Sequence, residues 1–199
     1  MRLLGEEALA RLPAVVEGEV ETPCGLAQGL VTVPGPPVCV VSIVRSGDIL
    51  QEAVRYLQPG VSVGKILIQR DESKPDKPAI LYYKKLPKNI SESFVILVDP
   101  MLATGGSAIR ALEVLKVSRE INTGKWRTRA KPLNIQDNGV KTENILFLNL
   151  VCCPEGLRAM AEHYPEISIL TGAVDSHLNQ DKYIVPGLGD YGDRYYGTT

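Results

Sequence analysis

The stretch VILVDPMLATGGSAIRALEVL, residues 95–115, combines an apolar run, a turn of small residues and an amphipathic helical pattern in one short segment. The first four residues are apolar and mostly β-branched, which is typical of a strand that is covered on both faces. The run ends at Asp99, and the helical pattern begins near Ser107. This order predicts a parallel sheet in which Asp99 lies at the carboxyl end of a strand, where such sheets bind ligands.

The turn itself holds Thr104, Gly105, Gly106 and Ser107 in a row. Small residues let the backbone turn tightly and direct consecutive N–H groups toward a ligand. The first amides of the following helix are unpaired and lie at the positive end of its dipole, as a phosphate site requires. From the spacing alone, a phosphate cradle and a purely structural turn are equally open interpretations. A Walker loop is excluded because no lysine follows the second glycine. Asp99 would repel a phosphate, so it suits sugar hydroxyls or a metal-bound water.

The rest of the chain repeats this alternation. Apolar runs predict strands at residues 38–44, 65–69, 93–100, 144–153 and 167–173, and helical patterns lie at residues 48–57, 107–116 and 154–165. Strands that alternate with helices indicate an α/β fold with a mainly parallel sheet. The 199 residues, 44% of them hydrophobic, are enough for a substantial core, and we expect one domain over residues 1–199.

Composition argues against several classes of function. The formal net charge of −1 gives no general attraction to nucleic acid or to an anionic membrane. No apolar run approaches the length of a membrane span, and the N-terminus lacks the apolar core of a secretory signal, so we expect a cytoplasmic protein. The four cysteines form no CxxC pair, which favours buried reduced thiols. The two histidines lie in separate segments, which argues against a His-based metal site or a Ser/His triad.

Two arginines follow predicted strands. Arg45 comes after the strand at residues 38–44 and precedes Ser46 and Gly47, where a guanidinium could hold a diphosphate through two oxygens. Arg70 is followed by Asp71 and Glu72, and the residues alone favour a surface salt bridge with these neighbours.

Four motifs together resemble a known family. VILVDPMLATGGS resembles the 5-phosphoribosyl-1-pyrophosphate (PRPP) signature of type I phosphoribosyltransferases, and its DPMLATGGS form resembles the uracil phosphoribosyltransferases. VSIVRSGD, GKILIQRDE and YIVPGLGDYGDRYYGT agree with that family in order and spacing, most closely with its fungal and other eukaryotic members. Most members of the superfamily carry two adjacent acids where this chain has Asp99 and Pro100. The resemblance implies helices on both faces of the sheet, a flap at residues 70–78 and a C-terminal base-recognition loop.

The resemblance also implies an activity: a pentosyltransferase of pyrimidine salvage that converts uracil and PRPP to UMP and diphosphate. It implies Arg45, Arg70 and Asp99 as catalytic residues, and uracil contacts at Ile184, Gly189, Asp190 and Tyr191. The glycines and Pro186 would fix a loop whose own C=O and N–H groups match the edges of a flat ring. Mg²⁺ is expected through PRPP, with no direct protein ligand, and a homodimer or homotetramer and a GTP effector are further expectations. The implied PRPP contacts are Arg45, Arg70, Asp99, Pro100, Met101, Leu102, Ala103, Thr104, Gly105, Gly106, Ser107 and Asp190.

Two departures from the family pattern leave alternatives open. The chain begins beyond the family's usual N-terminal helix, and the polar residues 117–138 interrupt the path to the strand at residues 144–153. We expect a solvated surface loop there, a nucleic-acid arm being a weaker competitor, and translated intron sequence is one hypothesis for its origin. A catalytically weak PRPP- or UMP-binding regulatory protein is the alternative function. An orotate transferase is less favoured, since the tail supplies only Arg194 for an extra carboxylate.

Overall fold

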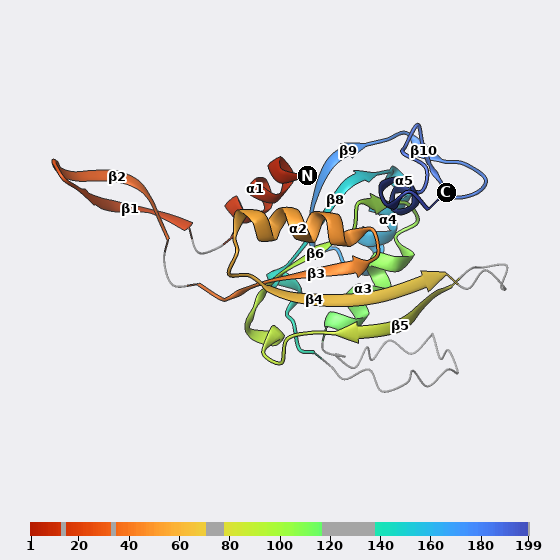
Figure 1. Ribbon diagram of the computed structural model, residues 1–199, viewed down its shortest axis with the longest axis horizontal. Helices are drawn as coiled ribbons and strands as arrows, with labels where there is room; N and C mark the ends of the chain where they lie inside the picture. Colours follow the sequence, from red (N-terminus) through yellow and green to blue (C-terminus); the bar gives the residue numbers. More distant parts are fainter. Residues whose placement is uncertain (13–14, 33–34, 71–77, 117–137, 199) are drawn as a thin grey trace.

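A parallel sheet forms the centre of the protein (Figure 1). The computed structural model describes residues 1–12, 15–32, 35–70, 78–116 and 138–198. Within these residues the strands lie in the order β5-β4-β3-β6-β8-β9, and β7 pairs with the end of β8 beyond β6. Every pairing in this sheet is parallel except that of β4 with β5. The strand bounds are Val38–Val44 (β3), Ser62–Arg70 (β4), Ala79–Lys85 (β5), Phe94–Val98 (β6), Met101–Leu102 (β7), Ile145–Cys152 (β8) and Ser168–Val174 (β9).

Helices cover both faces of this sheet, as the predicted α/β fold requires. Successive side chains of a strand point to opposite faces, so each buried strand contributes to two cores. Val40 and Ile96 pack with α1 (Arg2–Ala10) and α2 (Gly47–Leu57). Their neighbours Val41 and Leu97 pack with α3 (Gly106–Leu115) and α4 (Pro154–His163). Two short 3₁₀ turns, Ile90–Glu92 and Thr142–Asn144, precede β6 and β8. The predicted core strands and the three predicted helices are confirmed.

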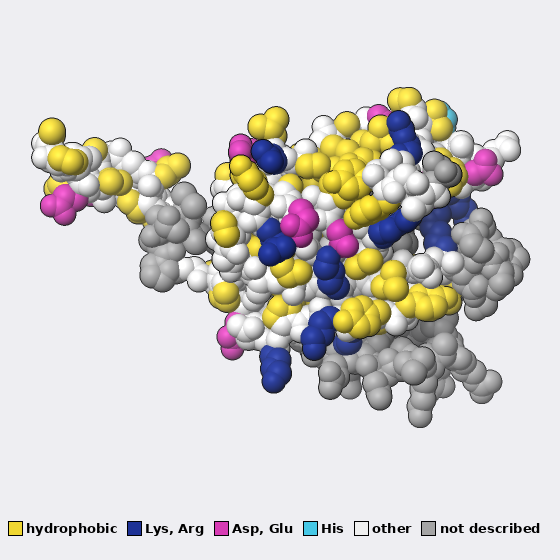
Figure 2. Space-filling view, in the orientation of Figure 1, with side chains coloured by type: hydrophobic (Ala, Val, Ile, Leu, Met, Phe, Trp, Pro, Cys, Tyr) yellow, Lys and Arg dark blue, Asp and Glu magenta, His cyan; other side chains and the backbone are white. Residues whose placement is uncertain are grey.

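The N-terminal third holds elements that the sequence did not reveal. After α1, the antiparallel strands β1 (Val15–Thr22) and β2 (Gly25–Thr32) form a hairpin that projects from the body (Figure 1). Its apolar side chains lie open on the surface, with Leu26 70% and Leu30 73% exposed (Figure 2). Among the described residues, no helix has the length and apolar character needed to cross a membrane. The cysteines are free thiols, three of them buried as predicted, while Cys24 in the hairpin is exposed.

The C-terminal region corrects one expectation. The C-terminal loop expected from Ile184 onward begins with a strand, since Ile184–Val185 form β11, which pairs with β10 (His177–Leu178). The strand ends after Val185, because Pro186 has no N–H to donate and Gly187, with φ 54°, turns the chain away. The segment continues to α5 (Tyr191–Tyr196). A short pair of strands therefore precedes the predicted loop.

The described ends of the predicted insertion lie side by side. Lys116 and Val140 form a parallel bridge, and the Val140 amide donates to the Leu115 carbonyl over 3.1 Å. Lys116 has φ −74° and ψ 159°, and Gly139 has φ 71°. The two φ values are close to those of the two central residues of a type II turn, whose second position favours glycine. Leu115, Lys116, Gly139 and Val140 would therefore make a four-residue turn if Lys116 were joined to Gly139. Residues 117–137 themselves lie outside the described residues.

We predict that deleting residues 117–138 preserves the fold. The joined chain keeps the turn, and closing a much shorter loop costs less entropy, so unfolding free energy should be unchanged or higher by about 1–2 kcal/mol. Thermal unfolding followed by circular dichroism measures this directly. A matched deletion of the same length within the buried strand and helix at residues 95–116 serves as the unfolded control. A deletion variant that loses its cooperative transition would contradict the prediction.

Candidate functional site

The small-residue turn forms a cradle of amides at the carboxyl end of β6. Gly105 has φ 81°, a left-handed conformation that favours glycine, and it caps α3. The Gly105 carbonyl accepts the first helical bond, from Ile109, over 2.9 Å. The amides of the three residues between them therefore have no acceptor within the helix. They lie at the positive end of the α3 dipole, which is the arrangement that binds a phosphate.

Helix α4 supports this cradle from behind. Cys153, which precedes α4, directs its Sγ toward the Ala103 carbonyl at 3.3 Å. Gly156 lies so close that a Cβ added there would be 2.5 Å from the Ala103 carbonyl oxygen and 2.6 Å from that of Leu102. Only a glycine lets the helix approach the loop backbone at this distance. The contact holds the cradle against the body of the protein.

Asp99 is a buried carboxylate at the edge of the same space. It is 9% exposed, and the Ser46 hydroxyl, at the start of α2, donates to its Oδ1 over 3.1 Å. Burial raises the pKa of Asp99 from its ordinary value of 3.8 to about 7. Three interactions lower the pKa of Asp99: the hydrogen bond from Ser46, the hydrogen bond from the Met101 amide and the charge of Arg70. The charge of Asp190 raises the pKa further. The carboxylate is therefore poised to bind a hydroxyl or cation that offsets its charge.

The C-terminal loop is fixed by hydrogen bonds at several points. The Gly187 amide donates to Asp175 over 2.9 Å, and Arg194 donates to the Leu188 carbonyl over 2.9 Å. Asp190 caps α5 by accepting from the Asp193 amide over 2.9 Å. Gly189 has φ 67°, so the loop again needs a residue without a side chain. These hydrogen bonds hold the C-terminal loop in a defined conformation.

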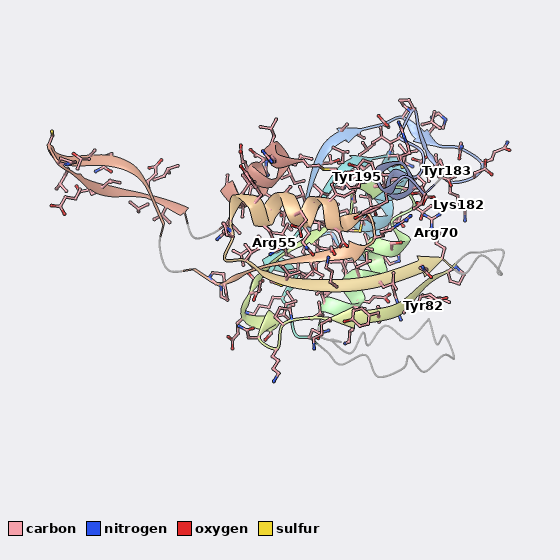
Figure 3. The ribbon with its side chains drawn as sticks, in the orientation of Figure 1. Arg55, Arg70, Tyr82, Lys182, Tyr183 and Tyr195 are labelled. Atoms are coloured by element: carbon pink, nitrogen blue, oxygen red, sulfur yellow. The ribbon has the colours of Figure 1, made fainter. Side chains whose placement is uncertain are left out.

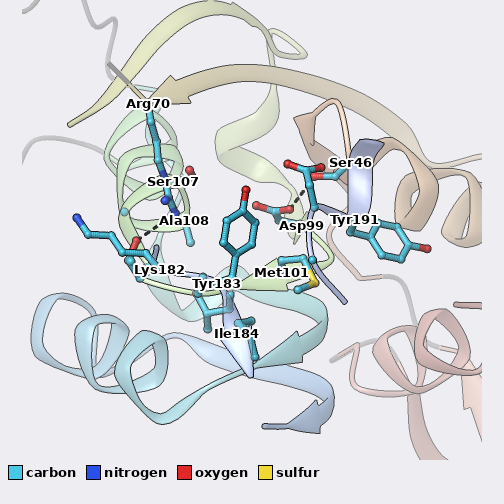
Figure 4. A pocket seen from close by; sticks show the side chains of 18 of the residues that line it. Ser46, Arg70, Asp99, Met101, Ser107, Ala108, Lys182, Tyr183, Ile184 and Tyr191 are labelled. Atoms are coloured by element: carbon cyan, nitrogen blue, oxygen red, sulfur yellow. Dashed lines mark hydrogen bonds between the residues drawn. The ribbon is translucent and has the colours of Figure 1, made fainter. Parts of the chain in front are cut away.

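Cradle, Asp99 and C-terminal loop line one cavity of about 720 Å³ (Figure 4). Elements far apart in the sequence meet here because the carboxyl ends of parallel strands share one edge of the sheet. The cavity is lined by Ser46, Arg70, Asp99, Met101, Leu102, Ala103, Thr104, Gly105, Gly106, Ser107, Ala108, Gln180, Asp181, Lys182, Tyr183, Ile184, Gly189, Asp190, Tyr191 and Gly192.

Two basic side chains from different elements, Arg70 and Lys182, line the cavity. Arg70 ends β4 and approaches the cradle, with its Nη2 3.4 Å from the Thr104 hydroxyl. Lys182 and Tyr183 come from the turn between β10 and β11, at the same end of the molecule as Arg70 (Figure 3). Asn179 shapes that turn by accepting from the amides of Lys182 and Tyr183. The ring of Tyr183 points into the cavity (Figure 4).

Most of the predicted site residues therefore lie together, with two exceptions. Pro100 does not line the cavity, since its carbonyl accepts from Leu150 and Val151 in β8. Arg45 does not line it either, and its guanidinium donates hydrogen bonds to Asp193 and Thr198 at the border of the cavity. The flap predicted at residues 70–78 falls largely outside the described residues, apart from Arg70 and Pro78. Arg70 and Pro78 are the two described residues that flank the rest of the predicted flap.

Sequence reasoning missed several lining residues. Ser46 and Gly192 lie within the quoted motifs and could have been found from their neighbours. Lys182 precedes the last motif, and its positive φ of 66° is unusual for a residue with a side chain. Gln180 and Asp181 carry no pattern that separates them from an ordinary surface turn. Their place depends on how β10 and β11 pack on α4, where Glu155 accepts from the Leu178 amide over 3.1 Å.

Comparisons with known proteins agree with this geometry. The sequence profile of the family described as uracil phosphoribosyltransferase matches residues 1–127 and 121–198. The uracil phosphoribosyltransferase of Saccharomyces cerevisiae is 46% identical over 98% of this chain and 80% of its own length. The solved structure of the AQ2163 protein from Aquifex aeolicus is 30% identical, with a TM-score of 0.74 over 100% of this chain and 82% of that one.

A more distant structure agrees in fold alone. The adenine phosphoribosyl transferase of Trypanosoma brucei is 12% identical, with a TM-score of 0.50 over 87% of this chain and 63% of that chain. The chain has the mainly parallel α/β fold of the type I phosphoribosyltransferases, and with the profile match and the yeast relative it belongs to the uracil phosphoribosyltransferase family.

Proposed function

We propose that this protein transfers the phosphoribosyl group of PRPP to uracil, releasing UMP and diphosphate. One observation carries the proposal: the phosphate cradle and the C-terminal loop open into a single cavity. The transfer requires a base and a sugar phosphate to meet, so their binding elements must share one space. The membership of the family supports the same reaction, since curated relatives from Dictyostelium discoideum and Saccharomyces cerevisiae bear this activity in their names.

The sugar phosphate has a natural place in the cavity. The amides of the cradle and the hydroxyls of Thr104 and Ser107 would bind the 5′-phosphate, which the helix dipole also attracts. Asp99 would repel a phosphate by its own charge and would instead accept hydrogen bonds from the ribose hydroxyls. Arg70, whose Nη2 lies 3.4 Å from the Thr104 hydroxyl, would bind the diphosphate beside the cradle.

The uracil ring would lie against the C-terminal loop. Tyr183 and Val185 bond through their carbonyls to Asn179 and Ser176, on the side of β10. In an extended strand the N–H and C=O of the residue between them point the other way, so those of Ile184 point away from β10. A uracil edge offers one donor between two acceptors, and a backbone N–H and C=O can match part of that pattern. Gly189, Asp190 and Tyr191 complete the proposed wall.

The chemical step needs positioning and electrostatic stabilisation more than a nucleophilic side chain. A uracil ring nitrogen attacks the anomeric carbon and releases its proton to solvent, while the bond from that carbon to the diphosphate oxygen breaks and its electrons leave with the diphosphate. Positive charge develops on the sugar and negative charge on the leaving group. The cradle fixes the sugar, the loop fixes the ring, and the Arg70 guanidinium stabilises the departing diphosphate.

The residues present fit a magnesium ion that arrives with its substrate. Asp99 and Asp190 line the cavity, and the described residues contain no cluster of three or more metal-ligating side chains. Mg²⁺ commonly keeps several waters and binds one or two carboxylates together with substrate phosphates. When bound, it would neutralise charge on the diphosphate. Asp190 would orient water or metal at that end of the cavity.

A turnover assay tests the proposal. Labelled uracil, PRPP and Mg²⁺ should give UMP and diphosphate, and free adenine, hypoxanthine or orotate should not compete with uracil. Binding of PRPP or UMP without product would instead support the regulatory alternative. The same assay on the variant that lacks residues 117–138 tests whether the segment bears on activity, and the proposal expects product from both proteins.

We predict that Arg70→Ala lowers kcat/KM for PRPP by about 10²–10³-fold, because a group that stabilises the leaving diphosphate is lost. Arg70→Lys should recover only part of this, since an ammonium cannot bind two oxygens in the same plane. Steady-state kinetics with each substrate varied measures the effect. Arg11→Ala is the matched control, since Arg11 pairs with Glu7 on exposed α1. Equal kinetics for Arg70→Ala and Arg11→Ala would contradict the assignment.

Assembly and regulation remain predictions. A homodimer or homotetramer is expected from the family resemblance, and light scattering across a range of protein concentrations measures it. GTP is expected as an effector, and turnover with and without GTP measures that. Fractionation of cells tests the predicted cytoplasmic location.

A further inference from the structure

Arg45 is held by the C-terminal end of the chain. Its Nη2 donates to Asp193 over 2.5 Å and its Nη1 to Thr198 over 3.0 Å. The Thr198 hydroxyl also donates to Asp193 over 2.6 Å, which closes a triangle of three side chains. Tyr196 adds to the cluster, with its hydroxyl 3.3 Å from the Arg45 carbonyl and its ring 5.3 Å from the guanidinium carbon. The segment after the base loop is therefore built around this arginine.

The contacts occupy one edge of the guanidinium and leave another open. Asp193 and Thr198 accept hydrogen bonds from Nη2 and Nη1, at the end of the guanidinium. The side edge, made of Nε and Nη2, faces Gly192, where an added Cβ would lie 3.7 Å and 3.6 Å from these atoms. Gly192 lines the cavity. Gly192, which has no side chain, therefore lies between this edge of Arg45 and the cavity, and Asp190 Oδ1 lies 3.3 Å from the same added Cβ.

A guanidinium binds two phosphate oxygens well only when its plane is already oriented. Arginine has many rotamers, and fixing them on binding lowers affinity unless the free protein has already fixed them. The Asp193 carboxylate is well suited to hold the Arg45 guanidinium in one orientation. The Thr198 hydroxyl and the Arg45 charge both favour the ionised form of Asp193 and lower its pKa. The carboxylate therefore stays charged at neutral pH.

We propose that Asp193 and Thr198 are positioning residues that hold the Nε/Nη2 edge of Arg45 beside Gly192, at the border of the cavity, where it binds the diphosphate of PRPP. The proposal rests on the proposed function, since it assigns that edge to a diphosphate oxygen pair. It also gives the C-terminal segment two tasks. Residues up to Tyr191 line the base side of the cavity, and Asp193 and Thr198 orient a cation for the leaving group.

Variants of Asp193 and Thr198 test the proposal in the full chain. Asp193→Ala should raise KM for PRPP and the dissociation constant of magnesium diphosphate about tenfold, with KM for uracil and kcat changed less than about threefold. Asp193→Asn keeps an oxygen acceptor at the same place and should recover most of that loss. Thr198→Val removes one hydroxyl and should give a smaller effect of the same kind. In an Arg45→Ala background, Asp193→Ala should have no further effect on either constant.

Other outcomes overturn the proposal. If Asp193→Ala and Asp193→Asn bind diphosphate more tightly than the wild type, Asp193 competes for Arg45 and does not position it. If KM for uracil rises as much as KM for PRPP, or the effect persists without Arg45, the residue has only a structural role. Thermal unfolding of each variant is recorded alongside, and Thr198→Val gives the answer if Asp193→Ala fails to fold. A wild-type protein without turnover overturns the proposed function, whereas diphosphate titration reads the positioning role separately.

Discussion

Gly156→Ala is expected to lower kcat/KM at least about 100-fold, although it adds a single methyl group. The methyl would lie 2.5 Å from the Ala103 carbonyl oxygen and 2.6 Å from that of Leu102, in the backbone that leads directly into the cradle. The cradle must therefore move, and displacement of a binding element by about 1 Å can cost 10²-fold in rate. Alanine favours a helix over glycine by up to about 1 kcal/mol, so the loss should occur in a protein that remains folded.

Steady-state kinetics together with thermal unfolding separates these effects. Gly60→Ala is the matched control, because an added Cβ there meets nothing within 4 Å. It should leave kcat/KM unchanged. A Gly156→Ala protein with the activity of Gly60→Ala would show that α4 does not support the cradle.

Asp99→Asn should have two separate effects, one on activity and one on the pH dependence of stability. Activity should fall about 10²–10³-fold, because the amide cannot accept hydrogen bonds from the ribose with a full charge. Stability follows from the pKa of Asp99, which burial raises to about 7. Below pH 4 the carboxyl is protonated in the folded and the unfolded state. As pH rises from about 4 to 7, the unfolded state loses its proton first, so the free energy of unfolding falls.

The size of this fall is at most about 4 kcal/mol, at about 1.4 kcal/mol for each unit of pKa difference. Asparagine does not titrate, so Asp99→Asn should gain stability relative to the wild type between pH 4 and 7. Urea unfolding at pH 4.5, 6 and 8 measures the difference between the two proteins. Parallel pH profiles for wild type and Asp99→Asn would contradict the raised pKa.

Ser46→Ala provides a graded comparison. It removes the hydroxyl that donates to Asp99 and favours its charged form. The pKa of Asp99 should then rise further, and the loss of stability should extend above pH 7. A profile identical to that of the wild type would show that the Ser46 hydrogen bond does not bear on Asp99.

Arg70 and Arg45 show which features of the site could be predicted from the sequence alone. Both were predicted as diphosphate contacts, each at the end of a strand, and the two look alike in the sequence. The structure places Arg70 in the cavity and turns Arg45 toward Asp193 and Thr198. The direction of a long side chain depends on which partner reaches it, and here that partner is 153 positions away. No local pattern could distinguish these two cases.

Gly105 and Gly156 show the same limit for backbone positions. The Thr104–Ser107 turn can be predicted from the sequence, because consecutive small residues with two glycines before a helix are typical of a tight turn. Gly156 lies within an ordinary helical pattern and gives no such signal. Its importance comes from Ala103 and Leu102, which α4 meets only after the sheet has formed.

The sequence by itself determined the alternation of strands and helices, the cradle after β6 and the glycine-rich loop near the C-terminus. These follow from local periodicity and backbone preference, which act between residues close in the chain. The tertiary structure alone decided that cradle and loop share a cavity, that Tyr183 and Lys182 line it, and that Arg45 is oriented from the C-terminal end. Such contacts join segments far apart in sequence, and their geometry is set by packing that no single segment encodes.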